Sequence, residues 1–175
     1  MTVRVGIGYD SHKFAPKGTN RKLMLGGVEI PHDQGLAGHS DADAVAHAVT
    51  DAILGAAALG DIGRLFPSHD PRWKDADSIS LLNQALLKVV EAGFQFLQAD
   101  VTIVAEHPKL APYIDAMQDR LADALLAGAT HVSVKAKTND GMGWIGRGEG
   151  VAVIAVAVLV EPKEPRLSSG LTGLE

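Results

Sequence analysis

Residues 38–52 read GHSDADAVAHAVTDA and place two histidines and three aspartates around the expected start of a helix. Ser40 is predicted to be the N-cap, because a serine hydroxyl accepts a hydrogen bond from an unpaired amide of the first turn. Asp43, three residues later, adds a carboxylate to that turn. The helix is expected to run from about Asp41 to Leu59 and to stop at the glycine that follows.

One stripe of this helix carries ionisable groups. Asp43, His47 and Asp51 follow one another at intervals of four residues, which places them on one side of an α-helix. The two carboxylates are expected to orient the imidazole or to have structural roles, and Asp51 could equally be a solvated helix residue. Apolar residues at other positions are expected to face a core: Val45, Val49, Ala52 and Ile53.

The composition is that of a globular protein: of 175 residues, 46% are hydrophobic and 21% are charged. A chain of this length can bury a sizeable core as one domain. The net charge of -5 offers no cationic surface, so neither nucleic acid nor a membrane is an expected partner. The absence of cysteine excludes disulfides, thiolate ligands and a thiol nucleophile. No leader or membrane span is recognised, so a cytoplasmic protein is expected.

Hydrophobic periodicity predicts the remaining elements. A loop at 60–77 is expected to form a wall of a site, because surface loops often carry function. The order of elements predicts an α/β fold of the two-layer α+β type, with helices covering one face of a mixed β-sheet. Strands are expected at 3–9, 22–25, 28–30, 94–106, 131–137 and 151–160, and helices at 79–90 and 112–125. The last strand is apolar on both sides, so the other sheet face is expected to be buried by self-association.

Two imidazoles and one carboxylate are candidate metal ligands. Asp10 and His12 are expected just past the first strand, and a spacing of two residues on a strand turns both side chains the same way. With His47 they make a three-ligand set suited to zinc with an open fourth position. Alternatively, Asp10 only accepts a hydrogen bond from a neighbouring histidine and His47 is an ordinary helix residue. The residues alone leave both interpretations open.

A second group of residues is suited to phosphate. Lys137, Thr138 and Asp140 precede the glycine-rich segment GMGWIGRGEG, residues 141–150, and together they offer a cation, a hydroxyl and accessible amides. A glycine-rich connection between strands is the alternative. His39 could likewise be a solvated loop residue, and Asp61 could simply cap a loop.

Four motifs in this order resemble the 2-C-methyl-D-erythritol 2,4-cyclodiphosphate synthase family: GYDSHKF at 8–14, GHSDADAVAHAVTDA at 38–52, GDIGRLFP at 60–67 and GRGEG at 146–150. The resemblance implies that residues 1–160 form a single domain of this family and that residues 161–175 are a C-terminal tail. It gives no sign of the additional cytidylyltransferase domain of fused relatives, so a stand-alone enzyme is expected.

The resemblance also implies a reaction. The 2-phosphate of 4-diphosphocytidyl-2-C-methyl-D-erythritol 2-phosphate attacks its own β-phosphorus, which closes a cyclic diphosphate and releases CMP in non-mevalonate isoprenoid biosynthesis. It further implies a homotrimer with sheets facing a threefold axis, and active sites between neighbouring subunits. Zn²⁺ is implied at Asp10, His12 and His47, and a second divalent cation, Mg²⁺ or Mn²⁺, at Asp140.

Residue by residue, His39 and Thr138 match catalytic positions of that family. Substrate-binding positions are matched by Ser40 at the phosphates; by Asp61, Ile62, Gly63, Phe66, Pro67, Ser68, His69 and Asp70 around the erythritol; by Ala105, Glu106, His107, Pro108, Lys109, Leu110 and Ala111 in the cytidine pocket; and by Lys137, Asn139, Trp144 and Arg147 in the glycine-rich region. For the last two, a structural part at the threefold axis fits equally well.

Some positions depart from the family pattern. Lys137 and Asn139 stand where hydroxyl residues are common, Asp140 where a glutamate is usual, and His107 is an uncommon residue of the cytidine segment. Two other functions stay open beside the synthase: a zinc-dependent phosphoester hydrolase with water in the fourth position, and a non-catalytic trimer that binds nucleotide or diphosphate.

Overall fold

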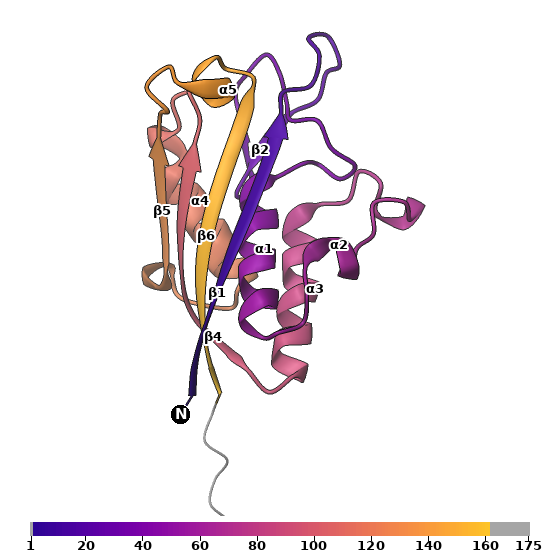
Figure 1. Ribbon diagram of the computed structural model, residues 1–175, viewed down its shortest axis with the longest axis vertical. Coiled ribbons are helices and arrows are strands. Elements are labelled where there is room, and N and C mark those ends of the chain that lie inside the picture. The colour runs from indigo at the N-terminus through magenta and orange to yellow at the C-terminus, as the bar shows by residue number, and fades with distance from the viewer. Residues whose placement is uncertain (1, 162–175) are drawn as a thin grey trace, which may run out of the picture.

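The computed structural model describes residues 2–161 (Figure 1). Four strands form one sheet in the order β1 (Thr2–Lys13), β6 (Gly150–Glu161), β4 (Gln95–Val104) and β5 (Val132–Lys137). The pairs β1–β6 and β6–β4 are antiparallel, whereas β4 and β5 are parallel. The sheet is therefore mixed, as the sequence predicted.

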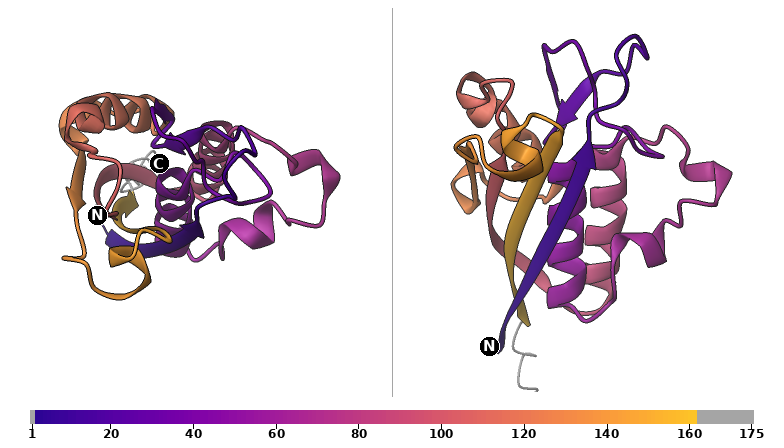
Figure 2. Two further views of the ribbon diagram at one scale, coloured as in Figure 1. Left: turned by 90° about the horizontal axis from the view of Figure 1, so that it is seen from above. Right: turned by 45° about the horizontal axis from the view of Figure 1, so that its top comes forward.

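The helices form a layer on one face of this sheet (Figures 1 and 2). Helix α1 (Ala44–Ala56) packs against β1 and β6, α4 (Ile114–Ala124) against β5, and α3 (Ser78–Glu91) against α1. The hairpin of β2 (Leu23–Leu25) and β3 (Val28–Ile30) turns at the predicted glycine pair, and both glycines have positive φ. The predicted α/β fold with helices on a mixed sheet is confirmed.

Short helices lie between these elements. Two of them interrupt the predicted loop at 60–77, where the carboxylates of Asp61 and Asp70 accept from first-turn amides. Another lies in the glycine-rich bend. They are α2 (Ile62–Leu65), η1 (Pro71–Trp73), η2 (Ala111–Tyr113), η3 (Ala129–His131) and α5 (Gly143–Gly146).

Two glycines allow α1 to lie directly on β1. A Cβ atom built on Gly8 would lie 1.9 Å from the carbonyl oxygen of Ala48, and one built on Gly6 would lie 2.1 Å from that of Ala52. Any larger residue would push the helix off the strand. Since Asp10 and His12 follow on the same strand face, this close approach brings them to the side of α1 that carries His47.

The predicted start of α1 was wrong by three residues. The N-cap is Asp43, whose side chain accepts hydrogen bonds from the backbone amides of Val45 and Ala46. Ser40 instead accepts from the amide of Ala42, a residue with left-handed φ of 61° that cannot belong to the helix. Since a carboxylate and a hydroxyl both suit an N-cap, composition alone did not choose between them.

The predicted C-terminal ends of this helix and of the first strand were also wrong. The helix ends at Ala56 rather than near Leu59, because Ala58 adopts a left-handed φ of 59°. The first strand does not stop at Tyr9 but pairs with β6 as far as Lys13, so Asp10 and His12 lie on the strand itself. Continuous pairing holds their side chains more rigidly than a loop would.

The sheet face opposite the helices is apolar along β1 and β6. Val3, Val5, Ile7 and Tyr9 alternate along β1 and are each more than half exposed, beside the exposed Ile154 of β6. A stripe of this kind is unusual on the surface of a monomer.

In residues 2–161, none of the helices has the length and apolar character to cross a membrane. The predicted tail, residues 161–175, lies outside the described residues except for Glu161, which ends β6.

Candidate functional site

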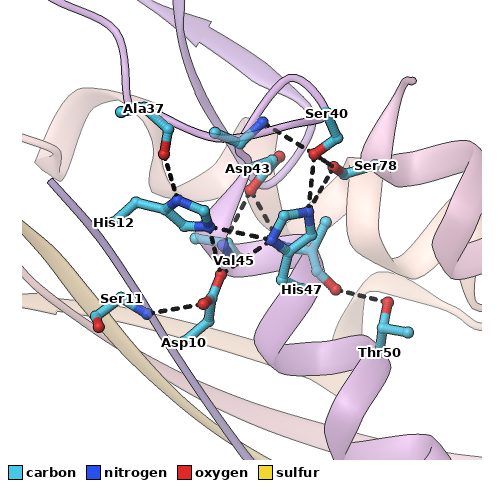
Figure 3. A network of polar contacts seen from close by, with 12 residues as sticks. Asp10, Ser11, His12, Ala37, Ser40, Asp43, Val45, His47, Thr50 and Ser78 are labelled. Carbon is cyan, nitrogen blue, oxygen red and sulfur yellow. Dashed lines mark hydrogen bonds and ion pairs between the residues drawn. The ribbon is translucent and has the colours of Figure 1, made fainter. Parts of the chain in front are cut away.

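Three donor atoms from β1 and α1 converge at one point (Figure 3). Asp10 Oδ2 lies 3.0 Å from both His12 Nε2 and His47 Nδ1, and these two nitrogens are 3.3 Å apart. Ligands of a tetrahedral zinc ion with bonds of about 2.0 Å are separated by about 3.3 Å, so the spacing suits that ion. The set of one carboxylate and two imidazoles also suits it chemically.

Each imidazole uses its other nitrogen in a hydrogen bond. His12 Nδ1 lies 2.6 Å from the carbonyl oxygen of Ala37, so it donates and leaves a lone pair on Nε2. His47 Nε2 lies 2.9 Å from Ser78 Oγ and 3.2 Å from Ser40 Oγ. Metal-binding histidines are commonly held in this way by a second partner. The two histidines therefore offer different ring nitrogens to one point.

The cluster contains the ionised carboxylate of Asp10, whose negative charge a cation would neutralise. Burial by itself would raise the pKa of the Asp10 carboxyl, but hydrogen bonds from His12 and His47 outweigh it and hold that pKa well below its usual range. Burial would lower the pKa of His12, yet its hydrogen bond to Asp10 raises it. Imidazole protons satisfy the ionised carboxylate here, and a metal ion bound to the same three atoms would take their place.

A cavity of about 410 Å³ opens beside these ligands. His12 and His47 form part of its wall, together with predicted substrate residues of the 60–77 segment and of the segment before α1. Its other lining residues are His39, Ser40, Ile62, Gly63, Arg64, Phe66, Pro67, Ser68, His69, Trp73 and Leu81. The structure thus brings the predicted metal ligands and most of the predicted erythritol-binding residues to one cleft.

The predicted phosphate contacts at the start of α1 need one correction. His39 and Ser40 line the cleft, but the first-turn amides of Val45 and Ala46 already donate to Asp43. Asp43 is fully buried, which raises its pKa, and it also accepts from the amides of the β2–β3 turn. Two first-turn amides are therefore already satisfied by Asp43, and His39 and Ser40 can contact an anion through their side chains.

The remaining predicted site residues gather in a second cavity of about 230 Å³. Glu106 belongs to its wall, and its Oε1 accepts hydrogen bonds from the amides of Asn139 and Gly141 at 2.9 and 3.0 Å. The other lining residues are Ala105, Pro108, Lys109, Leu110, Ala111, Ala136, Lys137 and Thr138. This cavity shares none of its residues with the first, so one subunit does not bring the cytidine and metal residues together.

The other predicted residues lie around these cavities. Asp61 caps α2 and accepts from the Arg64 amide, whereas Asp70 caps η1, and the hydrogen bonds from Arg72 lower its pKa to about 2. Thr138 Oγ1 donates to Asp140 at 3.3 Å.

Trp144 and Arg147 are on or next to α5, and Arg147 pairs with Glu149 at 2.6 Å. His107 precedes Pro108 through a cis peptide bond.

Sequence reasoning missed four residues, of which three line the first cleft and the fourth, Ser78, contacts His47 from outside the lining. Arg64, Trp73 and Leu81 line the cavity, and Ser78 contacts His47. Arg64 lies within the motif GDIGRLFP and could have been included on that ground. Nothing in the sequence indicated that Ser78 contacts a metal ligand, because a serine after Asp77 is typical of the first turn of a helix. Trp73 Nε1 is buried without a partner among the described residues.

The comparisons with known proteins identify the family of this chain. The model of the YgbB family matches residues 3–160. The 2-C-methyl-D-erythritol 2,4-cyclodiphosphate synthase of Moorella thermoacetica is 55% identical over 159 residues, which are 91% of this chain and 96% of the relative.

Two solved structures share the fold. The bifunctional IspDF of Campylobacter jejuni has a TM-score of 0.85 and 46% identity over 90% of this chain and 42% of its own. The IspF of Plasmodium falciparum, described as a CDP complex, has a TM-score of 0.78 and 30% identity over 91% of this chain and 96% of its own. This chain therefore belongs to the YgbB family, whose matched relatives are 2-C-methyl-D-erythritol 2,4-cyclodiphosphate synthases.

Proposed function

We propose that this enzyme converts 4-diphosphocytidyl-2-C-methyl-D-erythritol 2-phosphate to 2-C-methyl-D-erythritol 2,4-cyclodiphosphate and CMP in the first cleft. Relatives about 50% identical over most of the chain bear the name of that synthase. The observation that carries the proposal is the convergence of Asp10, His12 and His47 beside a cleft that His12 and His47 line and that is large enough for a small phosphorylated sugar.

The reacting groups require little acid–base chemistry from the protein. The nucleophile is a phosphate with a second pKa near 6, so at neutral pH it is mostly ionised. Positioning of the two phosphoryl groups and neutralisation of their charge are then the main tasks. A Zn²⁺ ion bound by Asp10, His12 and His47 would supply Lewis acidity to the attacked phosphate.

Other residues have roles that follow from their position. His39 and Ser40 lie beside the metal ligands and are proposed to contact the phosphates, with His39 acting in catalysis. Ser40 Oγ accepts from the Ala42 amide, which leaves its proton available to an oxygen in the cleft. The apolar side chains of Ile62 and Phe66 fit the methyl and carbon skeleton of the erythritol.

The second cavity is proposed to bind the cytidine and to complete the site from a neighbouring subunit. Segment 105–111 would hold the base, and Thr138 would donate to the transferring phosphate. Asp140 lies beside Thr138, where it could bind Mg²⁺ or Mn²⁺ on the diphosphate directly or through water. The complex of the Plasmodium falciparum relative with CDP supports a cytidine nucleotide as the ligand of this chain.

In a homotrimer, the first cavity of one subunit could lie beside the second cavity of its neighbour. The two cavities share no residue, and the exposed apolar stripe on β1 and β6 provides a surface by which copies of the chain can associate. Sheets facing a threefold axis would bury this stripe. Trp144 and Arg147 are proposed to act near that axis or at the substrate, since they lie just before β6 begins.

The proposal is tested by incubating the protein with the cytidyl substrate and Mg²⁺, before and after zinc removal. CMP and a cyclic diphosphate are expected from the zinc-loaded protein, identified by phosphorus NMR, and both are expected to be lost on chelation and restored by zinc. His47→Ala is expected to lose bound zinc and nearly all CMP release. A linear monophosphate product would indicate a hydrolase instead, and no turnover by the metal-loaded trimer would indicate a binding protein.

A further inference from the structure

Ser78 is a fully buried hydroxyl that joins a metal ligand to an aspartate outside the cleft wall. Its Oγ lies 2.9 Å from His47 Nε2 and donates to Asp41 Oδ1 at 2.5 Å (Figure 3 shows Ser78 and His47). Asp41 Oδ2 accepts from the backbone amide of Ser78 at 3.1 Å. A chain of contacts therefore runs from Asp41 through Ser78 to His47.

The direction of the hydrogen bonds in this chain follows from its carboxylate end. Within residues 2–161, the partners of the Asp41 carboxylate are all donors: the Ser78 hydroxyl, the Ser78 amide and the Asp43 amide. An ionised carboxylate only accepts, so the single hydroxyl proton of Ser78 is used toward Asp41. Ser78 Oγ can then only accept from the imidazole, which favours the His47 tautomer protonated on Nε2 over the tautomer that donates from Nδ1 to Asp10 Oδ2 at 3.0 Å.

This tautomer is the one that a metal requires. With the proton on Nε2, the lone pair of His47 lies on Nδ1, which is 3.0 Å from Asp10 Oδ2 and 3.3 Å from His12 Nε2. The opposite tautomer would direct an N–H into the ligand cluster and exclude the ion. We propose that Asp41 and Ser78 are positioning residues that hold His47 in its metal-binding tautomer. This inference rests on the proposed function only in taking His47 as a metal ligand.

Asp41 contributes to the cap of α3 through the Ser78 amide, but its hydrogen bond from the Ser78 hydroxyl is not part of that cap. Asp77 is already the N-cap, and its carboxylate accepts from the amides of Ile79 and Ser80 and from Ser80 Oγ at 2.6 Å. Ser40 cannot fully replace Ser78 as the acceptor for His47 Nε2. Its Oγ is farther from that nitrogen, at 3.2 Å, and already accepts from the Ala42 amide. The hydrogen bond between Asp41 and the Ser78 hydroxyl therefore acts on His47, by directing the Ser78 proton away from the imidazole.

The test measures the tautomer and the zinc affinity rather than activity. Ring nitrogen NMR of zinc-free protein in alkaline buffer is expected to show a population of His47 protonated at Nε2, in competition with the form that donates from Nδ1 to Asp10. In Ser78→Ala and in Asp41→Asn, the fraction protonated at Nδ1 is expected to rise. Zinc affinity, measured by chelator competition, is expected to fall about 10- to 100-fold in both variants, as for other groups that orient a metal ligand.

Ser80→Ala is the matched control, because it removes a hydroxyl two residues further along the same helix turn that contacts Asp77 and not His47. It is expected to keep the wild-type tautomer and zinc affinity. If Ser78→Ala also keeps both, the proposal is overturned; if only Asp41→Asn does so, the assignment of Asp41 is overturned. A wild-type protein that binds zinc but forms no cyclic product would overturn the proposed function and leave the tautomer result unaffected.

Discussion

At the scale of single residues, Glu106 connects two parts of the proposed substrate site. Its carboxylate belongs to the segment matched to cytidine binding, yet it accepts the amides of Asn139 and Gly141 and so holds the loop that carries Thr138. Sequence reasoning placed Glu106 among the substrate contacts. The structure adds a second role for it, in which one side chain satisfies two loop amides.

Glu106→Ala is expected to lower CMP release about tenfold. A hydrogen bond to a charged group contributes roughly 1.5–3 kcal/mol, and without it the loop that carries Thr138 is held less firmly. Steady-state kinetics with the cytidyl substrate measures the effect. Glu106→Gln is the matched control, since its amide oxygen can still accept both hydrogens, and it is expected to stay near wild type. Zinc content is expected to be unchanged in both. Equal activity of the alanine variant and wild type would exclude a role for this contact.

At the scale of elements, the metal ligands depend on how closely α1 lies on β1. The Asp-x-His pair is on a strand and His47 is on a helix, so their separation is set by the packing of the two elements. Gly8 and Gly6 permit that packing by leaving room for the carbonyl oxygens of α1.

Gly8→Ala is expected to lower the free energy of unfolding by about 1–3 kcal/mol and to weaken zinc binding, because its Cβ would meet Ala48 O and move α1 from β1. Urea denaturation and chelator competition measure the two effects. Gly55→Ala on the same helix is the control: its Cβ would approach only Ile7 O, at 3.9 Å, so stability is expected to be unchanged or raised by about 0.5–1 kcal/mol. Zinc binding by Gly8→Ala at wild-type affinity would contradict this account.

At the scale of the whole molecule, the proposed trimer accounts for two features together. One is the apolar stripe on the open sheet face, and the other is the division of the predicted site between two separate cavities. A single subunit leaves both unexplained, because apolar side chains gain stability from burial and a diphosphate substrate must reach both halves of the site.

Ile7→Glu is expected to shift the protein from trimer to monomer, since the side chain is 69% exposed on this face and a carboxylate buried there would be unpaired. Light scattering after gel filtration gives the mass. CMP release is expected to fall with trimer content. Leu87→Glu, at a 55% exposed position of α3, is the control and is expected to leave the mass unchanged. An Ile7→Glu trimer with full activity would contradict this interface.

The sequence by itself predicted the order of the main strands and helices and the helices on a mixed sheet, and it offered Asp10, His12 and His47 as a candidate ligand set. These features depend on local periodicity and on spacings of two and four residues, which a chain displays directly. The N-cap of α1 and the end of β1 were wrong, because Ser40 and Asp43 are equally good caps and strand length depends on pairing with the distant β6.

Only the tertiary structure decided how those ligands meet and which nitrogen each histidine offers. The hydrogen bond between Ser78 and Asp41 joins residues 37 positions apart, and it forms because α3 packs beside the loop that leads into α1. Contacts of this kind arise from the packing of whole elements and leave no periodic pattern in the chain. The residues 38–52 thus specify a core helix with one imidazole, while the fold around them specifies the direction in which that imidazole binds.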